Sequence, residues 1–460
     1  MDKKIIKALQ KALGKKQVLT SQEELLCYSY DGSGGNYSPE AVVFPSSTEE
    51  VARIMELASF FVFPVIPRGA GSGMTGGALA VSGGVVLALS RLNRILEIDE
   101  ENQIAVVEPG VITGDFQEEV RARGLYYPPD PASLKFCTMG GNVAECAGGP
   151  SALKYGVTRE YILGLEVVLP DGRVMETGVR TAKGVVGYDF TRLFTGSEGT
   201  LGIITKIIVR LIANPKSRGT FLALFTSMDK ATSLIAGLLK KITPAALEFL
   251  DRTALEIVKD KLPFALPEKT GSLLLLEVDG DSAMVEHQAA VMRKTLATGE
   301  GLLEVKEAKN EEEAAELWSA RKALSPSSFI LKPDKMSEDV VVPRTKIADL
   351  IRSAKKLSRK YGIIIFTFGH AGDGNIHINI MLDKKNENEY RQALDAKEKL
   401  FSEVLRLGGT LSGEHGVGIT KMAFLDREIS GVGIDMMKKV KSVFDPLNIL
   451  NPGKIFMIDS

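Results

Sequence analysis

The sequence predicts an α+β protein with more than one domain, and three observations lead to that prediction. The chain has 460 residues, whereas a single hydrophobic core stops growing near ~250–300 residues. Short apolar runs bounded by glycine-rich turns dominate the first half, and longer strand-like and helix-like stretches alternate after Asn214-Pro215. We therefore expect domains at residues 1–214 and 215–410, followed by a C-terminal segment, 411–460.

Composition excludes several classes of protein. Apolar residues make up 44% and charged residues 25% of the chain, which is usual for a folded soluble protein. Lys+Arg 57 nearly cancels Asp+Glu 58, so no basic excess exists to neutralise a nucleic-acid backbone. No stretch approaches the ~20 apolar residues of a membrane span, and none near the N-terminus reads as a secretion signal. The three cysteines, Cys27, Cys137 and Cys146, form no C-x-x-C pair, so we expect a cytoplasmic protein without its own iron–sulfur cluster.

A strand-helix-strand unit opens the first domain. Residues 41–44 read as a buried strand, and Ser47-Thr48-Glu49-Glu50 is a capping box that starts a helix with Val51, Ile54, Met55 and Ala58 on one face. A second strand is expected at 62–66. Further strands are expected at residues 85–89, 104–108, 163–169 and 202–211.

The second half predicts longer units and one hairpin. Strands are expected at 221–225, 273–278 and 302–305, with helices from Lys230 and Asp281 and another that carries Trp318. Residues 363–368 and 376–381 read as two strands joined by a turn at 371–374. Strand alternation then places Asn375, His377 and Asn379 on one face and Ile376, Ile378 and Ile380 toward the core.

The segment Pro67–Gly77 is a strong phosphate-binding signal. It reads PRGAGSGMTGG, and such closely spaced glycines let backbone N–H groups approach and cradle a diphosphate. Gly71-x-Gly73-x-x-Gly76 also fits the dinucleotide fingerprint, but that fingerprint requires a helix next. The strand after Gly83-Gly84 follows too soon for one. A nicotinamide-binding Rossmann unit and a glycine-rich hairpin that binds nothing are the alternatives.

Further glycine segments lie at 128–149 and 196–203, and residues 163–172 read LGLEVVLPDG. With these motifs, nearly the whole chain resembles the FAD-linked oxidases of the vanillyl-alcohol-oxidase type. Within them it is most similar to the group of glycolate oxidase FAD subunits and D-lactate and D-2-hydroxyglutarate dehydrogenases. The resemblance implies a PCMH-type FAD-binding domain of two subdomains and an α+β cap domain with an antiparallel sheet. It also implies that the C-terminal segment returns to the flavin.

The resemblance also assigns residues to FAD. The glycine loop would hold the diphosphate, and the segments near Thr138–Gly149 and Glu198–Ile203 would line the adenosine and flavin. We expect noncovalent FAD, because relatives that attach flavin through histidine need one near the loop and the first histidine here is His287. The implied FAD contacts are Arg68, Gly69, Ala70, Gly71, Ser72, Gly73, Met74, Thr75, Pro131, Thr138, Gly141, Asn142, Ala144, Gly148, Gly149, Tyr155, Glu198, Gly202, Ile203 and Asn451.

Three of the four histidines cluster in polar, glycine-flanked motifs near the C-terminus. His370 lies at the end of the predicted hairpin, where it could meet His377, and Glu414-His415 comes from a distant glycine turn. Two imidazoles and a carboxylate suit a divalent metal, although a hydrogen-bonded turn residue is the alternative for each histidine alone. By resemblance, His370, His377 and Glu414 are ligands of Zn, Mn or Fe, and His415 is the general base.

Substrate contacts follow from the same resemblance. Arg321 matches the family's carboxylate-binding arginine, whose planar guanidinium can hold a carboxylate through two parallel hydrogen bonds, and Asn379 is the second implied contact. A solvated helix arginine is the alternative. Hydroxyglutarate dehydrogenases carry a lysine with which Lys335 does not align, so a monocarboxylate such as glycolate or D-lactate is favoured.

The expected reaction is oxidation of a 2-hydroxy acid to the 2-oxo acid, with the hydride passing to FAD. A D-2-hydroxyglutarate dehydrogenase, a non-catalytic FAD subunit and a metal-dependent hydrolase with structural glycine loops are the alternatives. The chain has no cysteine set for an electron relay, so a partner is expected to collect the electrons. That partner would be an iron–sulfur or flavin subunit or an electron-transfer flavoprotein, through which the protein could associate with a membrane.

Overall fold

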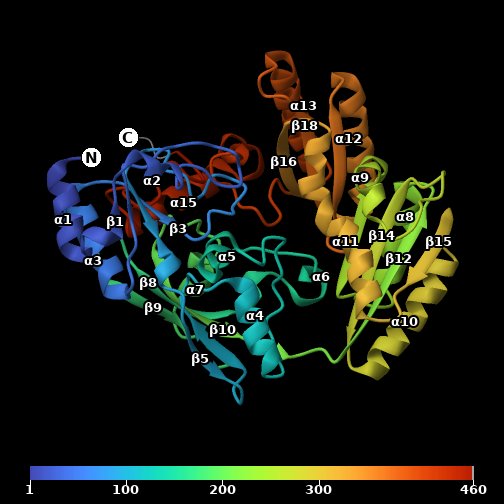
Figure 1. The fold of residues 1–460 in the computed structure, drawn as a ribbon, viewed down its shortest axis with the longest axis horizontal. Coiled ribbons are helices and arrows are strands. Elements are labelled where there is room, and N and C mark those ends of the chain that lie inside the picture. The colour runs from blue at the N-terminus through green and yellow to red at the C-terminus, as the bar shows by residue number, and fades with distance from the viewer. Residues whose placement is uncertain (458–460) are drawn as a thin grey trace. The chain divides into compact units, whose positions relative to one another are not determined.

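The computed structural model describes residues 1–457, and the chain divides into two compact units. Unit 1 comprises Met1–Ala147, Val157–Asn214 and the chain from Glu414 onward, and unit 2 comprises Gly148–Gly156 and Pro215–Gly413. The sequence assigns residues 148–156 to the first domain, whereas the structure places them in unit 2. Figure 1 labels many of the elements of each unit.

Unit 1 begins with a small mixed sheet. Its strands are β1 (Val18–Leu19), β2 (Ala41–Val43), β3 (Val65–Arg68) and β4 (Val85–Ala88), in the order β1-β2-β4-β3, and β2 and β3 both run parallel to β4. Helices α1 (Lys3–Leu13) and α3 (Thr48–Phe61) bury Leu9 and Ile54 in the same apolar core as strand residues Val43 and Val65. The short helix α2 spans Gln22–Leu26.

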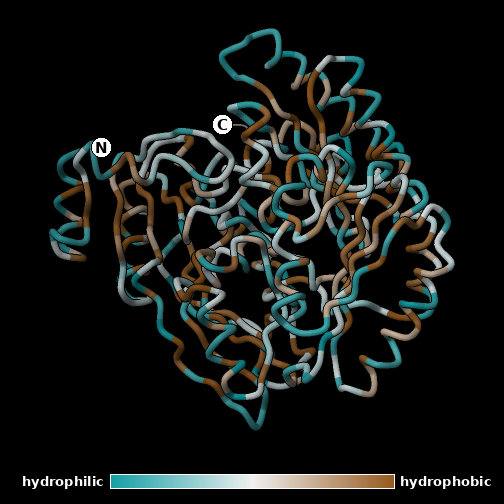
Figure 2. The backbone as a smooth tube through the Cα atoms, turned by 45° about the vertical axis from the view of Figure 1, so that its right-hand side comes forward, coloured by the Kyte–Doolittle hydropathy of each residue, from teal (hydrophilic) through white to brown (hydrophobic). Residues whose placement is uncertain are grey.

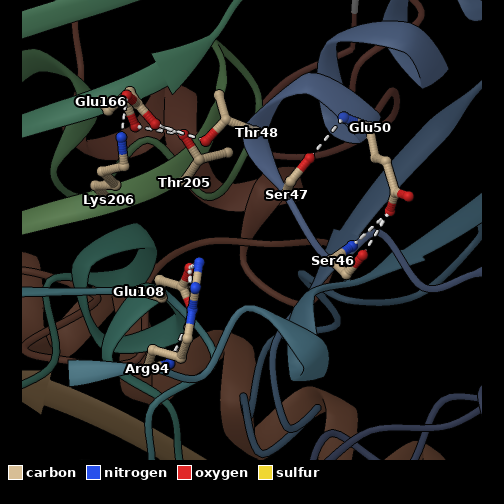
Figure 3. Close-up of polar contacts among 9 residues, drawn as sticks. All are labelled: Ser46, Ser47, Thr48, Glu50, Arg94, Glu108, Glu166, Thr205 and Lys206. Atoms are coloured by element: carbon tan, nitrogen blue, oxygen red, sulfur yellow. Dashed lines mark hydrogen bonds and ion pairs between the residues drawn. The ribbon is translucent and has the colours of Figure 1, made fainter. Parts of the chain in front are cut away.

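Helix α3 begins where its capping box predicts (Figure 3). The Ser47 hydroxyl accepts from the backbone N–H of Glu50 at 3.3 Å, and the Glu50 carboxylate accepts from the Ser46 N–H at 2.7 Å. The helix ends at Val62, which takes a left-handed conformation with φ 51°. The next strand therefore starts at Val65 and not at residue 62 as predicted.

The second sheet of unit 1 is antiparallel, in the order β5-β6-β10-β8-β9. Thr48 of α3 donates to Glu166 of β8 at 2.6 Å, and Lys206 of β10 donates to the same carboxylate at 2.7 Å (Figure 3). Helix α3 is thus joined to the second sheet by a polar contact. The strands are β5 (Ile95–Asp99), β6 (Ile104–Val107), β8 (Ile162–Val168), β9 (Val174–Gly178) and β10 (Ile203–Arg210), with β7 (Leu125–Tyr126) paired to β11 (Ile212–Ala213).

The other helices of unit 1 are α4 (Thr113–Ala122), α5 (Met139–Glu145), α7 (Phe190–Phe194), α14 (Leu425–Glu428) and α15 (Gly431–Phe444). The C-terminal segment belongs to the core of this unit, because Ile449 and Leu450 pack in the same cluster as Val65. Leu450 also forms a parallel bridge with Val65.

Unit 2 is built on one antiparallel seven-stranded sheet, in the order β15-β12-β14-β13-β17-β18-β16. Buried apolar residues of β12, β13 and β17 pack against Leu255 of α9 and Leu324 of α11. Figure 2 shows teal and brown alternating along the helices, as expected for amphipathic helices on a core. The strands are β12 (Ser217–Phe225), β13 (Ala246–Asp251), β14 (Ser272–Gly280), β15 (Leu302–Glu307), β16 (Asp334–Val341), β17 (Ile364–His370) and β18 (Asn375–Leu382), and the helices are α6 (Ala152–Tyr155), α8 (Met228–Leu239), α9 (Arg252–Val258), α10 (Ser282–Ala297), α11 (Glu311–Ser327), α12 (Ile347–Tyr361) and α13 (Glu387–Arg406).

These elements confirm the α+β class and every strand predicted from an apolar run. The predicted hairpin forms β17 and β18, with both faces of β18 buried. Strands β13 and β16 of unit 2 were not predicted, and neither were β1, β5, β7, β9 and β11 of unit 1. Among residues 1–457 no helix combines the length and apolar character that crossing a membrane requires.

Candidate functional site

The glycine loop connects two parallel strands, β3 and β4. Residues 69–84, all described by the structure, contain no helix, so neither a Rossmann turn nor a hairpin is present and both alternatives are wrong. A Cβ on Gly69 would lie 2.4 Å from Thr138 Oγ1, and one on Gly77 would lie 2.8 Å from Glu145 Oε1. The loop therefore lies directly against α5, as only glycine allows.

Helix α5 lies within the glycine segment at residues 128–149 and contacts the glycine segment at residues 196–203. Thr138 caps its first turn by accepting from the Gly141 N–H at 3.3 Å, and Asn142 donates to Thr113 Oγ1 at 2.8 Å. The Glu198 N–H donates to the Ala144 carbonyl at 2.8 Å. The segments that the sequence assigns to FAD are thus brought together around one short helix.

The C-terminal segment is bound to the glycine loop through Thr75. The Thr75 hydroxyl donates to the His415 carbonyl at 3.0 Å, and the Thr75 carbonyl accepts from the Ile419 N–H at 2.8 Å. Asn451 donates to the carbonyls of Gly77 at 2.9 Å and Glu198 at 2.8 Å. Three of the predicted FAD residues, Thr75, Glu198 and Asn451, therefore hold this region together.

Glu198 makes several of the contacts between the glycine segments and the C-terminal segment. It has a left-handed φ of 53°, and its carboxylate accepts from the backbone N–H groups of Val417 and Gly418, both at 2.7 Å. Burial raises the pKa of Glu198, and burial together with the neighbouring Glu198 raises the pKa of Glu145. Burial also lowers the pKa of Lys454 to about 8. Ionisable groups of both signs therefore lie beside the loop.

Some predicted FAD residues are engaged by the protein itself. The Arg68 guanidinium donates to the Tyr30 carbonyl at 2.8 Å and lies over the Tyr28 ring at 5.6 Å. Ile203 packs in the core, and a Cβ on Gly202 would lie 2.3 Å from Val167. Within unit 2, which also contains Gly148 and Gly149, the Tyr155 hydroxyl donates to Asp279 at 2.8 Å. The remaining assignments, Ala70, Ser72, Met74 and Pro131, rest on their positions in the loops.

The candidate metal centre lies at the β17–β18 hairpin. The rings of His370 and His377 are edge to face, with centroids 5.2 Å apart. Glu414 follows Gly413, the last residue of unit 2, and its carboxylate and the two histidines offer ligand atoms within 4.8 Å of one another. Two imidazoles and one carboxylate match the donors that Zn, Mn and Fe accept, so the residues fit the predicted metal.

A buried carboxylate lies behind each histidine. His370 Nδ1 is 2.5 Å from Glu248 Oε1, and His377 Nδ1 is 3.8 Å from Asp339 Oδ1. Asp339 also accepts from Asn375 Nδ2 at 2.5 Å and from the Gly413 N–H at 2.8 Å. Carboxylates in this position orient metal-binding imidazoles. Sequence reasoning missed both, although acids beside apolar residues in ALEFLD and SEDVVVP were a usable signal.

Arg321 lies on α11 and pairs with the same Glu248. Its Nε donates to Glu248 Oε2 at 2.7 Å, and its guanidinium lies 4.5 Å from the centre of the Phe368 ring. Its side chain is 12% exposed, so the alternative of a solvated arginine is wrong. Burial alone would raise the pKa of Glu248, but His370 and Arg321 hold it below its ordinary value.

Asn379 and His415 complete the predicted site residues. The Asn379 carbonyl oxygen accepts from Ser337 Oγ at 3.0 Å, while its Nδ2 is buried and has no hydrogen-bond partner in the described part of the chain. That N–H group can serve a ligand. His415 Nε2 lies 3.9 Å from Glu414 Oε1, so the predicted base neighbours a predicted ligand.

Two family models match the chain. The FAD binding domain model matches residues 39–178, and the model of the C-terminal domain of FAD linked oxidases matches residues 214–455. This chain belongs to the FAD-linked oxidases. The match confirms the predicted family and FAD as its cofactor, and it makes the hydrolase alternative wrong.

Relatives of this FAD-linked oxidase cover nearly its whole length. The glycolate oxidase subunit GlcD of Bacillus subtilis is 45% identical over 95% of this chain and 93% of its own. A D-lactate dehydrogenase of Anaerostipes hadrus is 35% identical over 97% of this chain and 96% of its own. A structure of p-cresol methylhydroxylase with substrate bound superposes with a TM-score of 0.83 over 99% of this chain and 98% of that chain, and at 20% identity it shows the fold alone.

We expect Gly418→Ala to release FAD. Gly418 has φ +51°, and a Cβ there would lie 2.1 Å from the Thr75 carbonyl oxygen. Strain of about 1–3 kcal/mol, placed on the glycine loop, should weaken FAD binding about tenfold or more, measured as the ratio of flavin to protein absorbance after gel filtration. Gly124→Ala is the control, because Gly124 has φ +75° with nothing within 4 Å. Equal FAD retention by the two variants would contradict the role of this contact.

Proposed function

We propose that this FAD-linked oxidase oxidises a small 2-hydroxy monocarboxylate, such as glycolate or D-lactate, to the corresponding 2-oxo acid. The observation that carries the proposal is the donor set of His370, His377 and Glu414, with a buried carboxylate behind each histidine. The names of the relatives, a glycolate oxidase subunit and a D-lactate dehydrogenase, support the same substrate class.

In this proposal the chain's own residues bind and deprotonate the substrate. The Arg321 Nη groups bind its carboxylate, since Nε is already held by Glu248. The buried Nδ2 of Asn379 donates to a substrate oxygen, and His415 removes the hydroxyl proton. A bound divalent metal would supply charge stabilisation for the alkoxide, and bound FAD would supply the hydride acceptor.

The monocarboxylate preference rests on Lys335. The Lys335 ammonium donates to Ser325 Oγ of α11 at 2.8 Å and lies 5.1 Å from the Phe329 ring centre. Burial lowers the pKa of Lys335 to about 8. The lysine is therefore engaged within its own unit by Ser325 and Phe329, which favours glycolate or D-lactate over D-2-hydroxyglutarate as substrate.

The same donor set argues against a non-catalytic FAD subunit, because a carrier of FAD alone has no use for two oriented imidazoles and a nearby base. Noncovalent FAD is part of the proposal, since no histidine precedes His287. Electrons would leave through an iron–sulfur or flavin subunit or an electron-transfer flavoprotein. The word subunit in the name of the Bacillus subtilis relative supports such a partner.

We expect chelators to abolish oxidation of glycolate and D-lactate without releasing FAD, because the proposed ligands lie outside the glycine loop. The measurement is dye-linked turnover and flavin content after dialysis against a chelator, followed by separate additions of Zn²⁺, Mn²⁺ and Fe²⁺. Recovery with one ion would identify the metal. Full activity in a preparation verified to be free of metal would remove the metal from the proposal.

Substitution of the proposed base should affect turnover specifically. We expect His415→Asn to lower kcat by roughly 10²–10⁴, the usual contribution of a positioned base, with an unchanged flavin spectrum. His287→Asn is the matched control, because His287 lies on α10 and outside the proposed site. An unaffected kcat in the His415 variant would mean that another group takes the proton.

The proposed partner has a kinetic consequence. We expect the substrate-reduced enzyme to be reoxidised by dissolved oxygen much more slowly than it turns over with an artificial acceptor. Stopped-flow mixing with air-saturated buffer, followed at the flavin absorbance band, measures that rate. Reoxidation as fast as steady-state turnover would make the chain a self-sufficient oxidase and remove the need for a partner.

A further inference from the structure

Glu248 is a buried carboxylate shared by two groups of different proposed function. The register of β13 and β17 places it directly opposite His370, and its side chain is fully buried. Oε1 lies 2.5 Å from His370 Nδ1, and Oε2 accepts from Arg321 Nε at 2.7 Å. Each oxygen therefore contacts a different partner.

Burying the Glu248 carboxylate among apolar neighbours costs desolvation free energy, so stability alone is a poor explanation for it. Leu250, on the same face of β13, and Leu275, which pairs with Glu248 on β14, are both buried. A buried ion pair in such surroundings can often be replaced by apolar residues without loss of stability. A structural role explains a salt bridge to Arg321, but it does not explain why the second oxygen meets a ring nitrogen of His370.

The neighbouring strand offers a comparison. Glu277 of β14 also contacts α11, where it accepts from Trp318 Nε1 at 2.9 Å, and it accepts from Thr220 Oγ1 at 3.2 Å. It also pairs with Arg218 at 3.4 Å. Two carboxylates of one sheet thus contact the same helix, and Glu248 is the one whose contacts include a histidine.

We propose that Glu248 is a positioning residue that fixes the metal-facing nitrogen of His370 and the orientation of Arg321 together. The inference rests on the proposed function. By accepting from Nδ1–H, Glu248 selects the tautomer whose Nε2 can bind a metal and makes that nitrogen a better ligand. By holding Arg321 through Nε, it leaves the two Nη groups for a carboxylate.

Binding of the metal and binding of the substrate carboxylate then both depend on the Glu248 side chain, although it contacts neither the metal nor the substrate. Glu248→Gln keeps the size of the side chain and one hydrogen-bond acceptor but removes the charge. The metal Kd should therefore rise about 10- to 100-fold, as for other carboxylates behind metal-binding histidines. KM for the hydroxy acid should rise in the same variant, because Arg321 loses its charged anchor.

The test is the Zn²⁺ Kd of purified, FAD-loaded protein by competition with a chromophoric chelator, with KM and kcat measured on the same preparations. Glu277→Gln is the matched control and should leave the Kd within about twofold of wild type, since its carboxylate reaches no proposed ligand. Flavin content and thermal unfolding of each variant report on folding. A Glu248→Gln protein with wild-type Kd and KM would overturn the inference.

A double variant covers the case in which Glu248→Gln alone does not fold. Glu248→Gln with Arg321→Met removes both charges of the buried pair, so no unpaired charge remains. Its Zn²⁺ Kd should still be raised, because His370 still lacks its carboxylate. A wild-type Kd in the double variant would overturn the inference. Absence of Zn²⁺ binding by wild type would instead overturn the proposed metal site and this inference with it, so the two failures are distinguishable.

Discussion

The buried carboxylate of Asp339 holds the candidate metal centre in place. It accepts from the Gly413 N–H at 2.8 Å and from Asn375 Nδ2 at 2.5 Å, and it lies beside His377. Gly413 precedes Glu414 directly, so this one side chain fixes where a carboxylate from a distant part of the sequence leaves the backbone. The two histidines are brought together by the hairpin alone, but the third donor depends on Asp339.

Glu198 of unit 1 resembles Asp339 of unit 2, because it is also a buried carboxylate that accepts from backbone N–H groups. Its left-handed backbone is strained for a residue with a side chain, and its carboxylate binds two consecutive N–H groups at Val417 and Gly418. The segment that follows Glu414 is thereby tied to the glycine segment at residues 196–203. In each unit, an acid that would be costly to bury alone is satisfied by backbone donors of the same C-terminal stretch.

Sequence reasoning succeeded where the signal is local. The start of α3 follows from Ser47 and Glu50, and the β17–β18 hairpin follows from alternation around a glycine turn. It failed where the role of a residue depends on its neighbours on other strands. Glu248 and Asp339 matter because they pair in register with His370 and His377, and no spacing along the chain encodes that pairing.

The contacts of Asp279 bear on how this protein could be recombined with its relatives. Lys154 and Tyr155 both bind Asp279, with Lys154 Nζ 2.5 Å from one carboxylate oxygen and the Tyr155 hydroxyl 2.8 Å from the other. A chimaera that exchanged only residues 215–413 would leave residues 148–156 behind, paired with a foreign strand. Crossover points for a functional exchange of unit 2 therefore have to be chosen in pairs, so that both segments are inherited from the same parent.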